Sequence, residues 1–232
     1  MIQALQDRDP IVRAAAAREL RHFKDKRAFE PLMERLNDQD DRVRADAIAS
    51  LQEFDDEKVL ELSIEHLKDK SISIRRGCVL YMKRKPDKRA VEPLISLLND
   101  QDAFIAPWSA EALGAIGDMK ATEPLIRALK GELNRNRMFG GDMDLRVNAA
   151  RALGLIKDES AVPTLISCLS DEDPRMREQA ISALREIGSP AALEAIKNFP
   201  GKDKPIPQQV TPGSPVIGEI PHPAIPKDTS RY

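Results

Sequence analysis

An apolar residue followed by arginine recurs along this chain at a step of 31 residues, and this repeat restricts the possible folds more than any other feature. A second apolar residue follows each anchor by eight positions, and in the fourth copy alanine replaces arginine. Only the fourth step differs, because it is 40 residues long and so contains nine extra residues. The anchor pairs are Val12-Arg13, Val43-Arg44, Ile74-Arg75, Ile105-Ala106, Leu145-Arg146 and Met176-Arg177.

Each copy predicts two helices. In the second copy Val43, Ala47, Ile48 and Leu51 form one apolar stripe at helical spacing, after an aspartate suited to the N-cap. Prolines at 31, 93 and 124 fit only the first turn of a helix, so they fix where the second helix of a copy begins. A hairpin of this kind cannot bury both of its apolar stripes alone, and neighbours must stack. The sequence therefore predicts an all-α solenoid of about six hairpins over residues 1–199.

The composition changes at residue 200. Eight of the 17 prolines fall in the last 33 residues, which predicts an extended or disordered arm of polyproline II character over residues 200–232. This arm keeps four aliphatic residues, Val216, Ile217, Ile220 and Ile225. Two interpretations stay open: the arm lays these side chains on a partner or on its own solenoid, or it is a tail without a binding role.

Three segments carry a resemblance to a known kind of repeat. They are Asp-Glu-Asp-Pro-Arg-Met-Arg at 171–177, Ala-Leu-Gly-Ala-Ile-Gly-Asp at 112–118 and Ala-Val-Glu-Pro-Leu-Ile at 90–95. They resemble the short HEAT repeats of the phycobilin-lyase (PBS lyase) HEAT-like type, over about residues 1–199. The resemblance implies the solenoid fold. It implies no single activity, since lyase subunits and scaffolds share the repeat.

Charge and cysteine content restrict the possible partners of the protein and its cellular compartment. A formal net charge of −2 gives no overall attraction to nucleic acid or to an anionic membrane. No apolar run approaches the roughly 18 residues that span a bilayer, and the N-terminus lacks the pattern of a signal peptide. Cys78 and Cys168 match no disulfide or metal spacing, which is typical of a reducing compartment. We expect a cytoplasmic protein with no membrane partner.

The sequence offers little material for catalysis. None of His22, His66 and His222 has a second histidine, cysteine or carboxylate at ligand spacing. HEAT-like metalloenzymes that hydroxylate a modified lysine carry repeated His-Glu pairs, which this sequence lacks. Cys78 and Cys168 replace small or apolar residues of the repeat, which predicts buried structural thiols. We therefore predict no catalytic, metal or cofactor-binding residue, no cofactor and no small-molecule substrate.

Functional residues are expected where the repeat pattern breaks. Phe104 and Trp108 occupy positions that other copies mostly give to polar or small residues, and they are four residues apart on one side of a helix. An outward aromatic pair is a candidate contact for a protein partner. Pro107, the fifth residue after the expected cap Asp102, is predicted to distort the first helical turn.

The insertion at 130–141 brings Arg135, Arg137, Met138 and Phe139 near the helix of Phe104. Two interpretations stay open. In the first, Met138 and Phe139 fold back and cover Trp108. In the second, the loop and the aromatic pair bind a partner together.

The third copy is strongly basic. Arg75, Arg76 and Arg84 belong to a cluster with four further arginines or lysines, two before and two after its single acid, Asp87. The cluster is suited to an acidic protein face or to phosphates, unless acids of the adjacent copies neutralise it.

These features together predict a non-enzymatic adaptor or assembly subunit that binds one or more proteins. The alternative is a phycobilin-lyase-like chromophore lyase or isomerase subunit, which rests on the repeat type and would need a pocket with convergent polar groups. The second alternative is nucleic-acid binding through the third copy, with a steep salt dependence. The proposed contacts are Phe104, Trp108, Arg135, Arg137, Met138, Phe139, Arg75, Arg76, Arg84, Val216, Ile217 and Ile220.

Overall fold

The computed structural model describes residues 1–54, 56–133 and 141–200, and for 141–144 it describes the helix but not the side chains. The chain divides into two units, Met1–Lys202 and Asp203–Tyr232. All described residues belong to the first unit. The predicted tail contacts Val216, Ile217 and Ile220 lie outside them, as do the insertion residues Arg135, Arg137, Met138 and Phe139.

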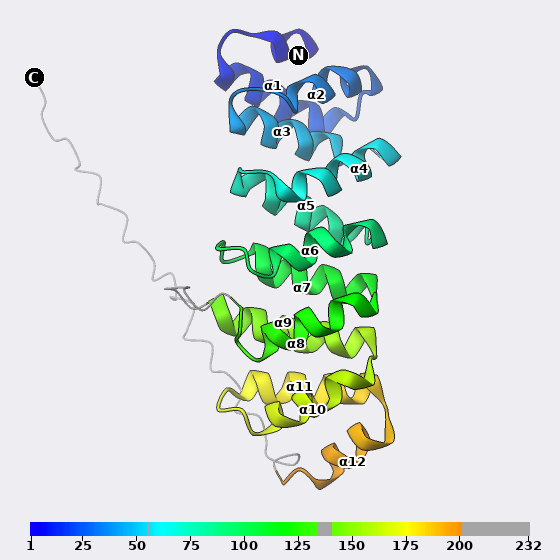
Figure 1. Ribbon diagram of the computed structural model, residues 1–232. Helices are drawn as coiled ribbons and strands as arrows, with labels where there is room; N and C mark the ends of the chain where they lie inside the picture. Colours follow the sequence, from blue (N-terminus) through cyan, green and yellow to red (C-terminus); the bar gives the residue numbers. More distant parts are fainter. Residues whose placement is uncertain (55, 134–140, 201–232) are drawn as a thin grey trace, which may run out of the picture. The chain divides into compact units, whose positions relative to one another are not determined.

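The described part of the chain forms twelve α-helices in six successive hairpins (Figure 1). The predicted all-α solenoid of six hairpins is therefore confirmed. A short 3-10 segment, η1 (Ile2–Gln6), precedes the first helix. The helices are α1 (Pro10–Phe23), α2 (Phe29–Arg35), α3 (Asp41–Leu51), α4 (Glu57–Glu65), α5 (Ile72–Arg84), α6 (Val91–Leu97), α7 (Ile105–Ile116), α8 (Thr122–Leu129), α9 (Gly141–Ile156), α10 (Val162–Ser167), α11 (Pro174–Ile187) and α12 (Pro190–Asn198).

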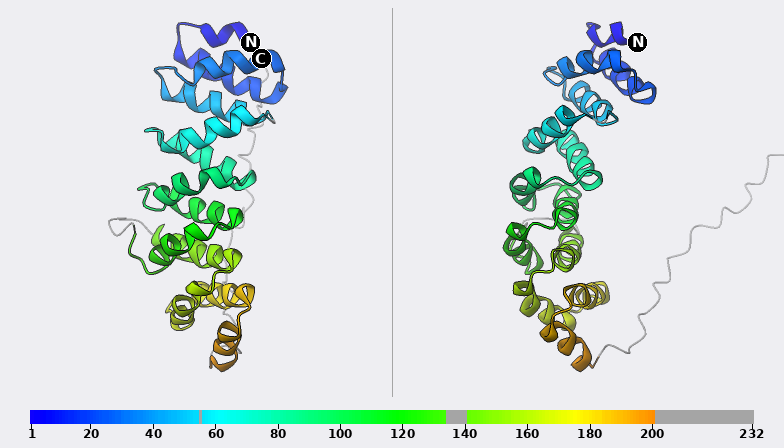
Figure 2. Two further views of the ribbon diagram at one scale, coloured as in Figure 1. Left: turned by 45° about the vertical axis from the view of Figure 1, so that its right-hand side comes forward. Right: turned by 90° about the vertical axis from the view of Figure 1, so that its right-hand side faces the viewer.

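Helices pack between hairpins more than within them. Each odd-numbered helix contacts the next odd-numbered helix, and each even-numbered helix up to α10 contacts the odd-numbered helix that follows it. The odd-numbered helices thus form one layer and the even-numbered helices a second layer (Figure 2). This is the nearest-neighbour stacking that the two apolar stripes of each hairpin require.

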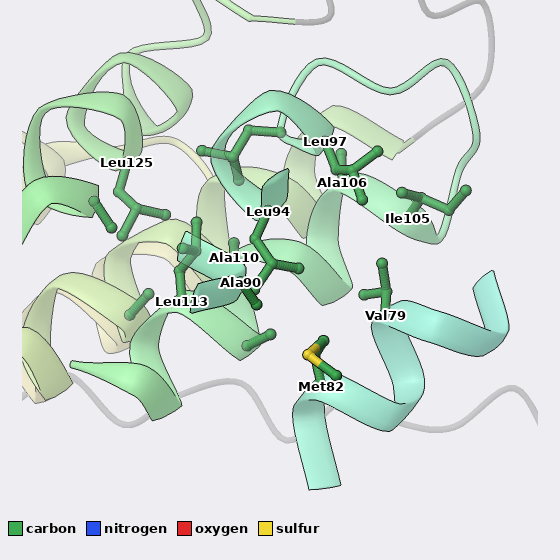
Figure 3. Packing of buried hydrophobic residues seen from close by; sticks show 14 of the residues in the cluster. Val79, Met82, Ala90, Leu94, Leu97, Ile105, Ala106, Ala110, Leu113 and Leu125 are labelled. Atoms are coloured by element: carbon green, nitrogen blue, oxygen red, sulfur yellow. The ribbon is translucent and has the colours of Figure 1, made fainter. Parts of the chain in front are cut away.

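The core runs without interruption from one hairpin to the next. The apolar anchor of each copy from the second to the sixth is at most 1% exposed. Figure 3 shows how Val79 and Met82 of α5, Leu94 of α6 and Leu113 of α7 converge between the third and fourth copies. Cys78 and Cys168 are buried free thiols, as predicted, and burial raises the pKa of both.

Three of the six odd-numbered helices, α1, α3 and α11, begin with the capping aspartate that the repeat predicts. The carboxylates of Asp9, Asp40 and Asp173 accept the backbone N–H two residues on, at 2.7–2.9 Å. In the other three copies the same position of the repeat is Ser71, Asp102 and Asp142, each of which the sequence predicts as a cap, and all three differ. Ser71 makes no side-chain hydrogen bond to cap α5 in the described structure, α7 begins three residues after Asp102, and α9 begins at Gly141, before residue 142.

Prolines stand where a helix tolerates them. Pro31, Pro93 and Pro124 are each the third residue of their helix, which confirms the predicted starts of α2, α6 and α8. The distortion predicted at Pro107 takes the form of a helix that begins later in its copy than the other odd-numbered helices do. Helix α7 begins at Ile105, so Pro107 also becomes a third residue and its missing N–H removes no helical bond. Asp102 still accepts the amides of Phe104 and Ile105, at 3.0 and 3.2 Å.

Two glycines let the odd-numbered helices of copies four to six approach closely. A Cβ on Gly114 would lie 2.8 Å from Ala152 Cα, and a Cβ on Gly154 would lie 2.8 Å from Ala183 Cα. Gly77 on α5 differs, since a Cβ there meets nothing within 4 Å. Across the described residues, no helix is both long enough and apolar enough to cross a membrane.

We expect Gly154→Ala to lower the free energy of unfolding by about 1–3 kcal/mol, because the new methyl group would overlap the backbone of α11. The matched control is Gly77→Ala, which should raise it by about 0.5–1 kcal/mol through helix propensity alone. Urea unfolding followed by circular dichroism measures both. Equal effects of the two substitutions would contradict the close approach of α9 and α11.

Candidate functional site

Phe104 and Trp108 form one aromatic pair at the start of α7. Phe104 is 48% exposed, whereas Trp108 is half-buried against the core. The backbone N–H of Trp108 donates to the carbonyl of Phe104 at 3.0 Å, which sets the two residues one turn apart. Their ring centroids are 5.3 Å apart and the rings are tilted by 32°. Phe104 thus faces outward as predicted, whereas Trp108, predicted to face outward too, is half-buried against the core.

An arginine and a lysine of α5 lie over the two aromatic rings. The Arg76 guanidinium carbon lies 4.8 Å from the Phe104 centroid, and Lys83 Nζ lies 5.6 Å from the Trp108 centroid. Such cation–π contacts contribute about 0.5–1 kcal/mol each at exposed sites. Acids of the fourth copy orient the same cations, since Arg76 Nε donates to Asp102 at 2.9 Å and Lys83 Nζ lies 2.5 Å from Glu111. The aromatic pair is thus fixed across the junction of α5 and α7.

A small hollow of about 170 Å³ lies beside this junction. It is below the roughly 300–1,000 Å³ of most ligand pockets, and it matches a single large side chain better. Leu155, at 47% exposure, brings an apolar wall from α9. The lining residues come from α5, α7 and α9, and they are Lys83, Glu111, Ala115, Arg151, Ala152 and Leu155.

The arginine of the anchor pair is a structural clamp. The Arg75 guanidinium donates to Asp100 at 2.8 Å and to the carbonyls of Asp69 and Lys70 at 2.9 and 3.1 Å. It therefore ties the loop before its own helix to the end of the next even-numbered helix. This arginine clamp recurs in four other copies, in part or in full, at Arg13, Arg44, Arg146 and Arg177.

The clamp leaves the Arg75 side chain only 16% exposed, with its donors engaged. Arg75, which the sequence predicts as a partner contact, is therefore not available for docking. The sequence contained a signal for this role, because an aspartate stands 25 residues after Arg13, Arg75 and Arg146. A pairing across that separation is not part of any helical period, so the repeat pattern alone did not suggest it.

The fourth copy lacks the parts of the clamp. Ala106 is fully buried at the position of the arginine, and Gly131 stands 25 residues later, where other copies have aspartate. The insertion begins beside Gly131, at the junction of the fourth and fifth copies. Whether Met138 and Phe139 cover Trp108 or contact a partner stays a prediction, because both residues lie outside the described part of the chain.

Acids of neighbouring copies pair with most of the basic cluster. Arg76 binds Asp102 and Lys83 binds Glu111, both from the fourth copy, and Arg89 binds Glu57 of the second copy. Arg84 differs, because it is exposed and its guanidinium carbon lies 5.9 Å from the Tyr81 centroid. The cluster is thus largely neutralised, and Arg84 is its most available member.

A family model described as HEAT repeats matches residues 1–76, 60–138 and 136–205. The chain belongs to the HEAT-repeat family. Its repeats are related to those of the PBS-lyase HEAT-like proteins, as the sequence analysis predicted.

The curated relatives match this HEAT protein over short segments. Bilin biosynthesis protein PecE of a Nostoc species is 47% identical over 66 residues, which are 28% of this chain and 26% of that protein. Phycocyanobilin lyase subunit alpha of Synechococcus elongatus is 40% identical over 73 residues, 27% of each protein. Deoxyhypusine hydroxylase of Danio rerio is 42% identical over 57 residues, 24% of this chain and 19% of that one. The chain thus spans less than a third of each relative.

Solved structures share the HEAT fold. An engineered protein aligns with 81% of this chain and 94% of its own at a TM-score of 0.61 and 20% identity. The complex of CpcE and CpcF of phycocyanin lyase from a Nostoc species aligns with 86% of this chain and 80% of that one, at a TM-score of 0.53 and 24% identity. At these identities the likeness concerns the fold alone.

Histidines and acids of the HEAT units are not arranged as a metal site. In the described ranges no group of three His, Cys, Asp or Glu side chains is close enough to hold a metal ion. His66 has a local contact instead, since its Nδ1 lies 3.0 Å from the Leu62 carbonyl oxygen.

We expect Arg75→Met to lower the free energy of unfolding by about 2–4 kcal/mol, because it removes the ion pair to Asp100 and two donors to backbone carbonyls. Arg84→Met on the same helix is the matched control and should change it by less than about 0.5 kcal/mol. Thermal and urea unfolding measure the difference. A small effect at Arg75 would contradict its role as a clamp.

The clamp also predicts an acid sensitivity. The Arg13 guanidinium donates to both Asp38 oxygens at 2.8 Å and holds the pKa of that carboxyl below its usual range. Stability from this pair is therefore full above the unfolded pKa of about 3.9 and is lost as the pH falls through the folded pKa. In Arg13→Gln, stability at neutral pH should be lower and its fall between about pH 5 and 2 shallower. Parallel urea-midpoint curves for variant and wild type would refute the assignment.

Proposed function

We propose that this HEAT solenoid is a non-enzymatic docking subunit that binds one or more proteins, and that Phe104 and Trp108 are central contacts. The observation that supports this most is the cation-held aromatic pair on the side of the odd-numbered helices. Tryptophan and arginine are enriched among residues that dominate protein interfaces. Rings already fixed in place lose little conformational entropy on binding, which favours affinity.

A second candidate is a bilin-lyase-like subunit. Two of the relatives are named for bilin biosynthesis and for phycocyanobilin lyase, and these names favour this candidate over an adaptor of unspecified role. The two candidates overlap, because the related CpcE structure was solved as a complex with CpcF. Docking on another protein is thus part of both candidates, and chromophore handling belongs to the second alone.

Nucleic-acid binding through the third copy has less support. Arg75, Arg76, Lys83 and Arg89 each have an acid within ion-pair distance. A phosphate would have to compete with these carboxylates for each cation.

The docking proposal predicts that Trp108→Ala weakens partner binding by about 30-fold or more, as expected for a central aromatic contact worth at least about 2 kcal/mol. The tagged protein is purified from its native cell, and the partner identified by mass spectrometry is then titrated against each variant. Phe23→Ala is the matched control, since Phe23 is 62% exposed at the end of α1.

Two outcomes would count against this assignment. Retention of the partner at full affinity by Trp108→Ala would exclude the aromatic pair as a central contact. A visible absorption band in the purified protein, or its appearance on adding phycocyanobilin, would favour the lyase-like candidate. Both outcomes are read on the same preparation.

A further inference from the structure

The aromatic pair belongs to a wider apolar patch across three odd-numbered helices. Lys83 of α5 contacts the Trp108 ring of α7 and also lines the hollow that Leu155 of α9 closes. Leu80, at 40% exposure, precedes Lys83 by one turn on α5. The mid-array patch is defined as Leu80, Phe104, Trp108 and Leu155 with the hollow between α7 and α9.

The first two copies show what the same positions look like without such a patch. There, neighbouring odd-numbered helices are joined by ion pairs, Arg18 with Asp46 at 2.8 Å and Arg21 with Glu53 at 3.0 Å. In the repeat register, Trp108 stands where Asp46 stands, and Leu155 stands where Glu53 stands. Two positions that carry paired acids next to α1 thus carry apolar side chains in the middle of the array, where α5 and α7 keep the ion pair between Lys83 and Glu111. This contrast separates the patch from ordinary surface.

Positive charge borders the mid-array patch. Arg84 follows Leu80 by one turn, and Arg151 lines the hollow beside Leu155. Both are exposed, and neither forms an ion pair with another residue of the described chain. The charge of Arg84 acts on Glu53, but that carboxylate already pairs with Arg21 and Lys24, and Glu111 beside the hollow already pairs with Lys83. The unbalanced charge at the border is thus basic, which is complementary to an acidic partner.

The spacing of the patch fits a helix. Trp108 is the third residue after its anchor and Leu155 the tenth, so they are offset by about 10.5 Å along the helix axes in addition to the roughly 8–10 Å between packed helices. The resulting separation of about 14 Å lies between the axial distances from i to i+7 and from i to i+11 of an α-helix, about 10.5 and 16.5 Å. A helix laid obliquely across α7 and α9 can therefore place one apolar side chain against Trp108 and another in the hollow at Leu155.

We infer that the mid-array patch binds an acidic amphipathic helix of a partner protein, whose apolar ridge covers Trp108 and Leu155 and whose carboxylates meet Arg84 and Arg151. This inference rests on the proposed docking function and names the chemistry of its partner. The unit Asp203–Tyr232 of the same chain does not match this description. It has as many basic as acidic residues and is rich in proline, which interrupts helices.

A displayed library tests the inference with defined probes. Its members are 18-residue helices with leucine fixed at i, i+3, i+4 and i+7 and with flanking positions randomised among Glu, Gln and Lys. Selection against the full chain should enrich Glu at the flanks. Enriched peptides are then synthesised and titrated using the fluorescence of Trp108, which is the only tryptophan of the chain.

Charge reversal provides the decisive comparison. Replacing the flanking Glu by Lys in a selected peptide should weaken binding by about 10-fold or more, and Arg84→Glu with Arg151→Glu should invert that preference. Lys120→Glu, an exposed reversal in the turn before α8, should leave the affinity unchanged. Circular dichroism verifies that each variant is folded.

Several results would overturn the inference. These are enrichment without an acidic bias, no enrichment at all, or acidic peptides that bind the doubly reversed variant as tightly as the wild type. Binding of a synthetic peptide of residues 203–232, with a change in Trp108 fluorescence, would assign the patch to the chain's own tail. The peptide experiments could fail while a native partner still needs Trp108 for binding. That result would reject the acidic helix and would leave the proposed docking function in place.

Discussion

Burial between neighbouring hairpins is the interaction on which the whole array depends. An even-numbered helix contacts the odd-numbered helix that follows it, so the apolar stripe of one copy is completed by the next. The arginine clamp adds direction to this non-directional force, because Arg75 and its equivalents hold the loop between copies by hydrogen bonds to its carbonyls. Apolar stacking supplies most of the stability, and the clamp fixes the position of each copy relative to the preceding one.

The fourth copy departs from this scheme at several points that lie together. The clamp arginine is replaced by Ala106, the helix start is displaced by Pro107, and Trp108 occupies a position that is small or polar elsewhere. Cations of the third copy then pack on Phe104 and Trp108, where the first two copies have ion pairs between helices. The junction of α5 and α7 therefore adds an aromatic surface to its ion pairs, and the proposed docking function depends on that surface.

The sequence predicts the features that depend on residues close to one another in the chain. The stripe at Val43, Ala47 and Leu51 and the positions of Pro31, Pro93 and Pro124 determine helices and their starts through local sterics and burial. It did not reveal the partner of Arg75, because that pairing joins residues 25 positions apart, in the first helix of a hairpin and just after its second helix. The aromatic pair was found by its departure from the repeat, but the cations over it, the hollow at Leu155 and the late start of α7 depend on how two copies meet in space.

The altered clamp after the fourth copy has a consequence for how such arrays change in length. At the other junctions, extra residues between two copies would displace the carbonyls that an arginine such as Arg177 binds, and each added residue would weaken the lock. After the fourth copy Gly131 stands in place of the clamp aspartate, and Arg146 donates to the Leu129 carbonyl of α8 on the far side of the insertion, so additional chain can enter there while the flanking helices keep their contacts. The nine-residue insertion stands at the point of the array most tolerant of growth. That makes this junction the natural place to graft a new binding loop onto the solenoid.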